Sequence, residues 1–123
     1  MASYIKPDFL TLQASGNLSA KQYCFAKFGS DDDHVQACSV AGELGIGVIM
    51  NVASAAEEPV ELAICDGAKV KLAGTVARGG EIMCDSAGKG VAATTGKKVM
   101  AIAMASGVSG DVIPVKLVNY ELN

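Results

Sequence analysis

The stretch that decides the fold class runs from Val60 to Ala73 and reads VELAICDGAKVKLA. On both sides of the dipeptide Asp66-Gly67, apolar side chains alternate with polar or small ones. A period of two places successive side chains on opposite faces of a β-strand, and Asp-Gly between two alternating runs is a strong signal for a β-hairpin. The stretch therefore predicts two antiparallel strands joined by a tight turn.

The same alternation extends in both directions along the chain. Between glycine-rich turns, runs with β-branched residues predict ten strands, at residues 9–13, 22–28, 34–38, 46–52, 60–65, 68–73, 81–84, 91–94, 99–104 and 111–118. Only the segments 39–44 and 54–58 could form a helical turn. We therefore predict an all-β fold with little helix, a small β-sandwich or partly closed β-barrel that occupies residues 9–123 as a single β domain.

Two parts of the chain also resemble each other. In each, a strand of small apolar residues leads through a flexible loop into a Pro-Val-charged-Leu strand, Pro59 to Leu62 in one case and Pro114 to Leu117 in the other. This internal similarity predicts two pseudo-repeated hairpin units that pack as equivalent halves of one small fold.

Composition limits the classes of function. The 123 residues are 50% hydrophobic and 19% charged, with a formal net charge of −3. Nucleic-acid-binding proteins present a basic surface, so this balance argues against a nucleic-acid partner. No apolar run approaches the length of a membrane helix, and the N-terminus lacks the apolar region of a signal peptide. We therefore expect no membrane partner and synthesis in a cytoplasm.

The sequence also lacks the groupings of residues that catalysis requires. A single His leaves few groups for acid–base chemistry near neutral pH. Asp31 to His34 is a cluster of candidate metal ligands, but adjacent residues of an extended chain point to opposite sides, so we interpret it as a solvated acidic loop. Gly42 to Gly47 lacks the ending of a phosphate loop, and Gly-x-Ser-x-Gly does not occur. We predict that the protein is not an enzyme and has no catalytic residue, no metal and no cofactor.

Four cysteines are present, Cys24, Cys38, Cys65 and Cys84. None forms a C-x-x-C pair, and the single His does not complete a zinc site. Three of them lie in apolar stretches, where a free cysteine is usually a small buried hydrophobic residue. We expect reduced and inaccessible thiols, which fits synthesis in a reducing compartment.

Residues 1–8, MASYIKPD, do not share the alternation of the rest of the chain. Pro7 favours an extended backbone and opposes a helix. An extended N-terminal arm that carries an aromatic, an aliphatic and a cationic side chain suits docking onto a neighbouring subunit. Tyr4, Ile5, Lys6 and Pro7 are therefore the candidate contact residues.

The turns and strands of the later part of the chain form a pattern found in a known family. The pattern comprises Gly79 to Ile82, Asp85 to Val91, Ala101 to Ala105, Gly110-Asp111 and Val115 to Val118, preceded by Pro59 to Ala63, Asp66-Gly67 and Gly74 to Val76. Over residues 45–118 the chain resembles the small capsid cement, or head decoration, proteins of tailed bacteriophages. The resemblance implies a β-rich structural protein that binds the outside of an expanded capsid and stabilises the shell.

The same resemblance sets the expectations for partners and location. It implies the major capsid protein as partner and a homo-oligomer, either a trimer or a dimer. The protein would be made in the cytoplasm of a bacterial host and would lie on the capsid exterior of the virion. Two alternatives remain: a structural module of a phage tail or baseplate, and a β-barrel that binds a small ligand or carbohydrate. The second is disfavoured because the chain has only three Tyr and three Phe to contact a sugar.

Overall fold

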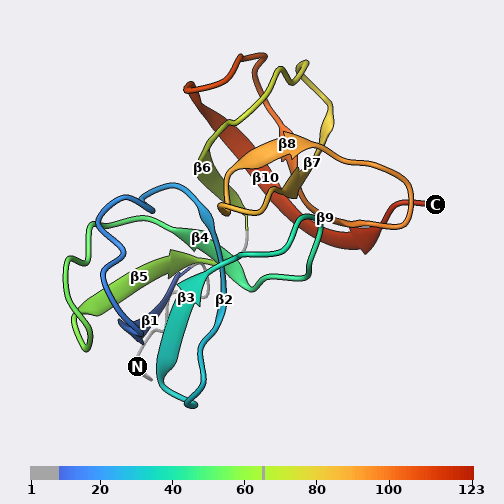
Figure 1. Ribbon diagram of the computed structural model, residues 1–123. Coiled ribbons are helices and arrows are strands. Elements are labelled where there is room, and N and C mark those ends of the chain that lie inside the picture. The colour runs from blue at the N-terminus through green and yellow to red at the C-terminus, as the bar shows by residue number, and fades with distance from the viewer. Residues whose placement is uncertain (1–8, 65) are drawn as a thin grey trace, which may run out of the picture.

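The computed structural model describes residues 9–64 and 66–123, and over these residues it consists of strands, turns and loops without a helix (Figure 1). The ten strands are β1 (Phe9–Ala14), β2 (Phe25–Phe28), β3 (His34–Ala37), β4 (Gly47–Ile49), β5 (Pro59–Ala63), β6 (Gly67–Lys71), β7 (Glu81–Cys84), β8 (Gly90–Ala92), β9 (Lys98–Ala103) and β10 (Val112–Glu121). Each of the ten predicted strands is present, and the all-β class is confirmed. The described residues include no helix that is long and apolar enough to cross a membrane.

Strands β1 to β5 form a closed barrel, which we call the N-terminal unit. Its strand order is β1-β3-β2-β4-β5, and β5 pairs with β1 to close it. All pairings are antiparallel except that of β1 with β3, which is parallel. The predicted β-barrel is confirmed in this unit, where the pairing of Phe9 through Gln13 with β5 closes it completely.

Strands β6 to β10 form a second sheet, which we call the C-terminal unit, in the order β6-β10-β9-β7-β8. Its outer strands approach each other as well, because Leu72, just after β6, forms a parallel bridge with Gly90 of β8. The amide of Ala73 also donates to the carbonyl oxygen of Gly90 at 2.9 Å. The second sheet is thus almost closed.

The two units repeat one topology. If β1 to β5 are matched in order with β6 to β10, every strand pairing recurs with the same direction, including the parallel contact between the first and third strands. The register recurs too, since Gln13 pairs with Pro59 as Lys71 pairs with Val112. The predicted hairpin units are confirmed as β4–β5 and β9–β10, each of which is an antiparallel pair.

The alignment of those hairpins from the sequence is wrong by two residues. The similarity placed Pro59 against Pro114, whereas Pro114 pairs with Lys69 and its equivalent Glu61 pairs with Thr11. A shift of two residues keeps each side chain on its own face of the strand, so the alternating pattern does not detect it.

The predicted hairpin around Asp66-Gly67 is also wrong. Strand β5 has β1 and β4 on its two sides, and β6 pairs with β10, so β5 and β6 belong to different units. Asp66 does adopt the left-handed backbone conformation that Asp-Gly favours, with φ 62°. The dipeptide turns the chain at the boundary between the units because both edges of β5 are already occupied.

The hydrophobic core crosses that boundary. One cluster of buried residues lies inside the N-terminal unit. The other includes Phe25, Cys38 and Val48 of the N-terminal unit together with buried residues of the C-terminal unit, Val70, Leu72, Val76, Ile82, Cys84, Met100, Ala101, Ala103, Ile113 and Val115. The two units therefore bury side chains against each other.

Backbone hydrogen bonds fix the junction. The amide of Phe25 donates to the Gly88 oxygen at 2.7 Å, and that of Lys71 donates to the Tyr23 oxygen at 2.9 Å. Gly88 has φ +86°, and a Cβ there would lie 3.1 Å from the Phe25 oxygen. Only glycine combines this backbone conformation with so close an approach. The segment between β3 and β4 also reaches across to the C-terminal unit (Figure 1), where the Gly42 amide donates to the Cys84 oxygen at 2.8 Å.

The prediction of buried free thiols is confirmed for Cys24, Cys38 and Cys84. Cys65 lies outside the described residues.

Candidate functional site

The candidate contact residues Tyr4, Ile5, Lys6 and Pro7 lie outside the described residues. The described chain starts at Phe9, which pairs with Ala63 of β5. Phe9, the first described residue, therefore lies beside the end of β5, whose last residue Ala63 is followed by Ile64.

An apolar groove with a volume of about 280 Å³ lies at this place, between β4 and β10. Its walls are formed by Leu44, Ile46 and Ile64 from the N-terminal unit and by Leu117 and Val118 from the C-terminal unit. Leu44 is 52% exposed and Ile64 is 36% exposed. Both units thus contribute to one apolar surface that solvent reaches.

Glycines bring the backbone close enough to form the floor of the groove. A Cβ on Gly45 would lie 2.5 Å from the Ala26 oxygen, and one on Gly47 would collide with the Ala63 oxygen. The amide of Gly45 instead points at the sulfur of Met100, 3.4 Å away, which lies under the groove. The small residues of this stretch therefore create the depression.

The rim of the groove is held by Glu43. Its carboxylate accepts hydrogen bonds from the amides of Ser39 and Val40, at 2.6 and 2.8 Å, and forms an ion pair with Lys27 at 3.1 Å. Although burial of the carboxyl opposes the effect, these donors hold the pKa of Glu43 below its ordinary value. The exposed side chains of Val40 and Leu44 flank this anchored residue.

The groove has the apolar character of a binding surface. Among the described residues, those that line it are apolar side chains and glycines with a single amide, Asn119. Burying a partner's apolar side chains there would be favourable by about 25 cal/mol per Å² of apolar surface removed from water.

The acidic segment Asp31 to His34 has a structural arrangement of its own. Asp31, Asp32 and Asp33 are exposed, in line with a solvated loop. Nε2 of His34 lies 2.8 Å from a carboxylate oxygen of Glu57, and Nδ1 lies 3.7 Å from Asp31. The hydrogen bond to Glu57 raises the pKa of His34 above its ordinary value, with smaller contributions from the charges of Glu57 and the aspartates. The pairing ties the turn before β3 to the loop before β5.

No group of three or more His, Cys, Asp or Glu side chains within residues 9–64 and 66–123 is arranged to hold a metal ion. The partner of His34 was not predicted, because Glu57 is distant in sequence and belongs to a loop with no pattern of its own.

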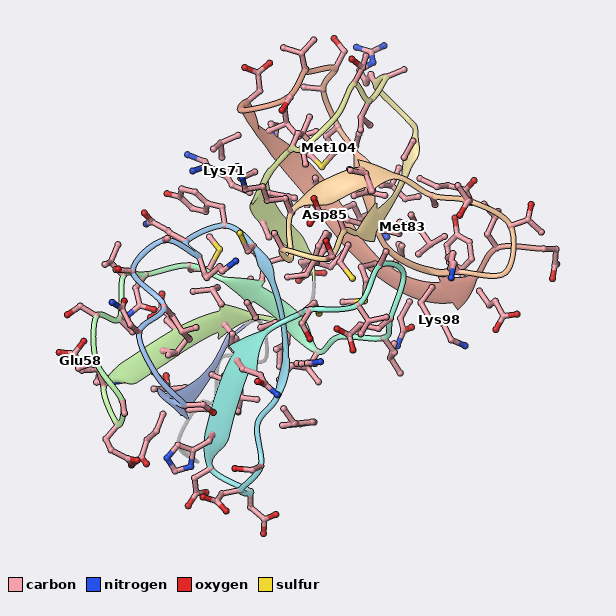
Figure 2. All side chains as sticks on the ribbon, viewed as in Figure 1. Glu58, Lys71, Met83, Asp85, Lys98 and Met104 are labelled. Carbon is pink, nitrogen blue, oxygen red and sulfur yellow. The ribbon has the colours of Figure 1, made fainter. Side chains whose placement is uncertain are left out.

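The loops before β5 and β10 are equivalent in the two units. In the first, Glu58 accepts from the amide of Ser54 at 2.6 Å, and in the second Asp111 accepts from the amide of Val108 at 2.9 Å. Figure 2 places Glu58 at the edge of the N-terminal unit that faces away from the C-terminal unit. In each of these surface loops, a carboxylate thus caps a backbone amide.

Comparisons with known proteins find a similarity of fold but not of sequence. No protein-family model matches the chain, and no curated protein matches it in sequence. Among solved structures, the fold is similar to that of the head fiber gp8.5 N base of bacteriophage phi29, with a TM-score of 0.75 and 14% sequence identity. The match covers 94% of this chain and 97% of that chain, so the two share their fold over nearly their whole length.

Proposed function

We propose that the protein is a structural component of a bacteriophage head, which binds the outer surface of the capsid and stabilises the shell. The observation that carries this proposal is the similarity of fold to a phage head fiber base over 94% of the chain. The sequence of residues 45–118 resembles capsid cement proteins, and this resemblance also favours a component of a phage head.

The surface of the molecule supports a binding role. The groove between the units offers exposed apolar side chains from Leu44 and Ile64. Exposed apolar surface that is contiguous across two parts of a protein is typical of an interaction site. In this proposal the major capsid protein is the partner, and the protein acts as a homo-oligomer on the capsid exterior after synthesis in the host cytoplasm.

The proposed contact combines the N-terminal arm with this groove. Tyr4, Ile5, Lys6 and Pro7 precede β1, whose first residue pairs beside Ile64 at the groove. Many copies on one particle make a weak single contact effective, because each copy stabilises the assembled shell that it binds.

The experiment is to delete Ala2 through Lys6 and to measure binding to shells that lack the protein, together with the melting temperature. We expect binding to fall by tenfold or more with an unchanged melting temperature. A second variant, Leu44→Asp, should weaken binding, whereas Val108→Asp, which alters an equally exposed side chain on a capped loop, should not.

Each outcome bears on the proposal. Unchanged binding of both the deletion and Leu44→Asp would move the contact to the loops at residues 54–58 and 106–110. Absence of any binding by the wild-type protein to shells would overturn the proposal, and binding to tails or baseplates would favour the alternative particle component.

A further inference from the structure

One face of the C-terminal unit is basic. On β6 and β10, side chains that point outward alternate with the buried side chains of Val70, Ile113 and Val115. The outward side chains, which we call the basic face, are those of Lys69, Lys71, Val112, Pro114 and Lys116. None of the three lysines forms an ion pair with a described residue, so their charges are not neutralised within one copy.

The equivalent face of the N-terminal unit is acidic. Thr11 of β1 pairs with Glu61 of β5 at the place where Lys69 pairs with Pro114 in the other unit. The acidic face consists of exposed residues of these strands and of the adjoining turns, namely Thr11, Gln13, Asp33, Glu57, Pro59 and Glu61. Two strand pairs of the same topology thus present carboxylates in one unit and ammonium groups in the other.

The difference in charge extends over the two units as a whole. Residues 9–64 hold two Lys against seven Asp and Glu, whereas residues 66–123 hold seven Lys and Arg against five Asp and Glu. Figure 2 shows Lys71 on the C-terminal unit and Glu58, next to the acidic face, at the far edge of the N-terminal unit. The two faces of one copy therefore do not meet each other.

A cavity lies at the end of each face. The cavity of the acidic face has a volume of about 360 Å³, and Asp33 and Glu57 lie in its wall. The cavity of the basic face has a volume of about 230 Å³, and Lys71 lies in its wall beside Tyr23. Each face thus offers a recess for side chains that carry the charge of the other face.

Tyr23 adopts a backbone conformation for which the other unit uses glycine. Its φ is 68°, and Gly79, which also lies two residues before the equivalent strand, has φ 86°. The amide of Tyr23 donates to the Ile49 oxygen and its carbonyl oxygen accepts from the amide of Lys71, and a glycine would form both bonds as well. A bulky residue that keeps a strained conformation is typical of a functional surface, and this ring lines the cavity of the basic face.

We propose that the basic face of one copy docks on the acidic face of a second copy. The inference rests on the homo-oligomer of the proposed function and names the surfaces that build it. Complementary charge orients the contact, and Val112 and Pro114 of one copy with Pro59 of the other give it an apolar part. Because the two faces are different, each copy contacts its neighbour through one face and retains the other, and such contacts form a ring when the rotation between copies closes.

Sedimentation velocity of the isolated wild-type protein gives the first test. The protein should assemble at low ionic strength. Raising the sodium chloride concentration from about 50 mM to about 500 mM should increase the protein concentration at half-assembly tenfold or more, because salt screens the attraction between exposed charges. A protein that stays monomeric at low ionic strength, or an assembly that salt does not weaken, would overturn the proposal.

Two variants then reverse the charge of one face each. Lys69→Glu/Lys116→Glu makes the basic face acidic, and Asp33→Lys/Glu61→Lys makes the acidic face basic. Each variant alone should require a protein concentration at least tenfold higher for half-assembly. An equimolar mixture of the two variants should assemble again, because every contact between unlike copies then joins opposite charges.

A matched control separates the effect of the face from that of net charge. Arg78→Glu/Lys97→Glu changes the net charge by the same amount at exposed residues outside the basic face and should assemble as the wild type does. Circular dichroism verifies that each variant is folded, and the salt dependence of the wild-type protein requires no variant.

Other outcomes decide against the two faces. The proposal fails if a charge-reversed variant assembles as the wild type does, or if the mixture of folded variants stays monomeric. Assembly that Leu44→Asp abolishes and charge reversal leaves unchanged would assign the contact to the groove between the units. Because no shells are present in these experiments, their failure would leave the capsid contact standing, and a failure to bind shells would leave this contact standing.

Discussion

The N-terminal and C-terminal units share every strand pairing but differ at the position where they meet. Phe25 at the start of β2 is fully buried in the core between the units, and its equivalent at the start of β7 is Glu81, which is only partly buried. The carboxylate of Glu81 instead accepts a hydrogen bond from the hydroxyl of Tyr120. The alternation of apolar and polar residues thus specifies the sheet in both units. A few differences between equivalent positions, such as Phe25 and Glu81, determine which face of each sheet is covered.

At a second pair of equivalent positions, the residue of the C-terminal unit is buried and that of the N-terminal unit is exposed. Phe28 at the end of β2 is 55% exposed, while its equivalent Cys84 at the end of β7 is fully buried at the junction. The N-terminal unit thus uses one face for the contact and the C-terminal unit uses another, as in a head-to-tail association of two similar subunits.

The largest expected effect comes from the anchor of the junction. Phe25→Ala should lower the free energy of unfolding by about 3–5 kcal/mol, because it removes a large buried side chain from the core that both units share. Chemical denaturation measures the loss. The matched variant Glu81→Ala, at the same place in the other unit, should cost less than about 1 kcal/mol. Equal losses of unfolding free energy in the two variants would contradict the different roles of Phe25 and Glu81 at the junction.

A smaller effect is expected at the glycine of the junction. Gly88 lies two residues before Gly90 of β8. The equivalent residue of the N-terminal unit is Asp33, which lies two residues before Val35 of β3. Gly88→Ala should destabilise the protein by about 1–3 kcal/mol, because a φ of +86° is strained for alanine and its Cβ would lie 3.1 Å from the Phe25 oxygen. Asp33→Ala, on an exposed turn, should change the stability by no more than about 0.5 kcal/mol. Thermal unfolding followed by circular dichroism distinguishes the two.

The smallest effect concerns pH. His34 of the N-terminal unit pairs with Glu57, whereas the equivalent positions of the C-terminal unit hold Lys89 and Gly110. The pKa of His34 is raised in the folded state by the Glu57 hydrogen bond. Its stabilising contribution is therefore complete below pH 6.5, the unfolded value, and is lost as the pH rises through the higher folded value.

Melting temperatures of the wild-type protein and His34→Gln across pH 5.5–9 test this sign. The difference between the two proteins should be largest at the acidic end and should shrink toward the alkaline end. Lys89→Gln in the other unit should give a difference that does not vary with pH over this range. A difference that grows with rising pH would show that the neutral imidazole is the stabilising form.

The sequence predicts the strands well because each has its own alternation and its own bounding turns. It does not predict which strands pair, and Asp66-Gly67 demonstrates why: the dipeptide specifies a backbone conformation that a hairpin and a junction between units use equally. The repeat of five strands is also hidden, since equivalent positions such as Phe25 and Glu81 have opposite chemistry.

The groove was missed for a related reason. Leu44 lies in the segment 39–44, which was predicted only as a possible helical turn, and Leu117 lies in the predicted strand 111–118. Their meeting depends on how the two units pack, which depends on Phe25, Gly42 and Gly88 and on no local pattern. The pairing of His34 with Glu57 is a contact between two loops and is equally invisible to periodicity.

Closure of the two units has a consequence for crowding. Within the described residues, each strand of the N-terminal unit has a neighbour on both sides, and the bridge of Leu72 with Gly90 shortens the free edges of β6 and β8. Unpaired strand edges are where β-rich proteins aggregate with one another. Copies of this protein packed at high local density would therefore meet through side chains and not through main-chain hydrogen bonds, which protects them from fusing into shared sheets.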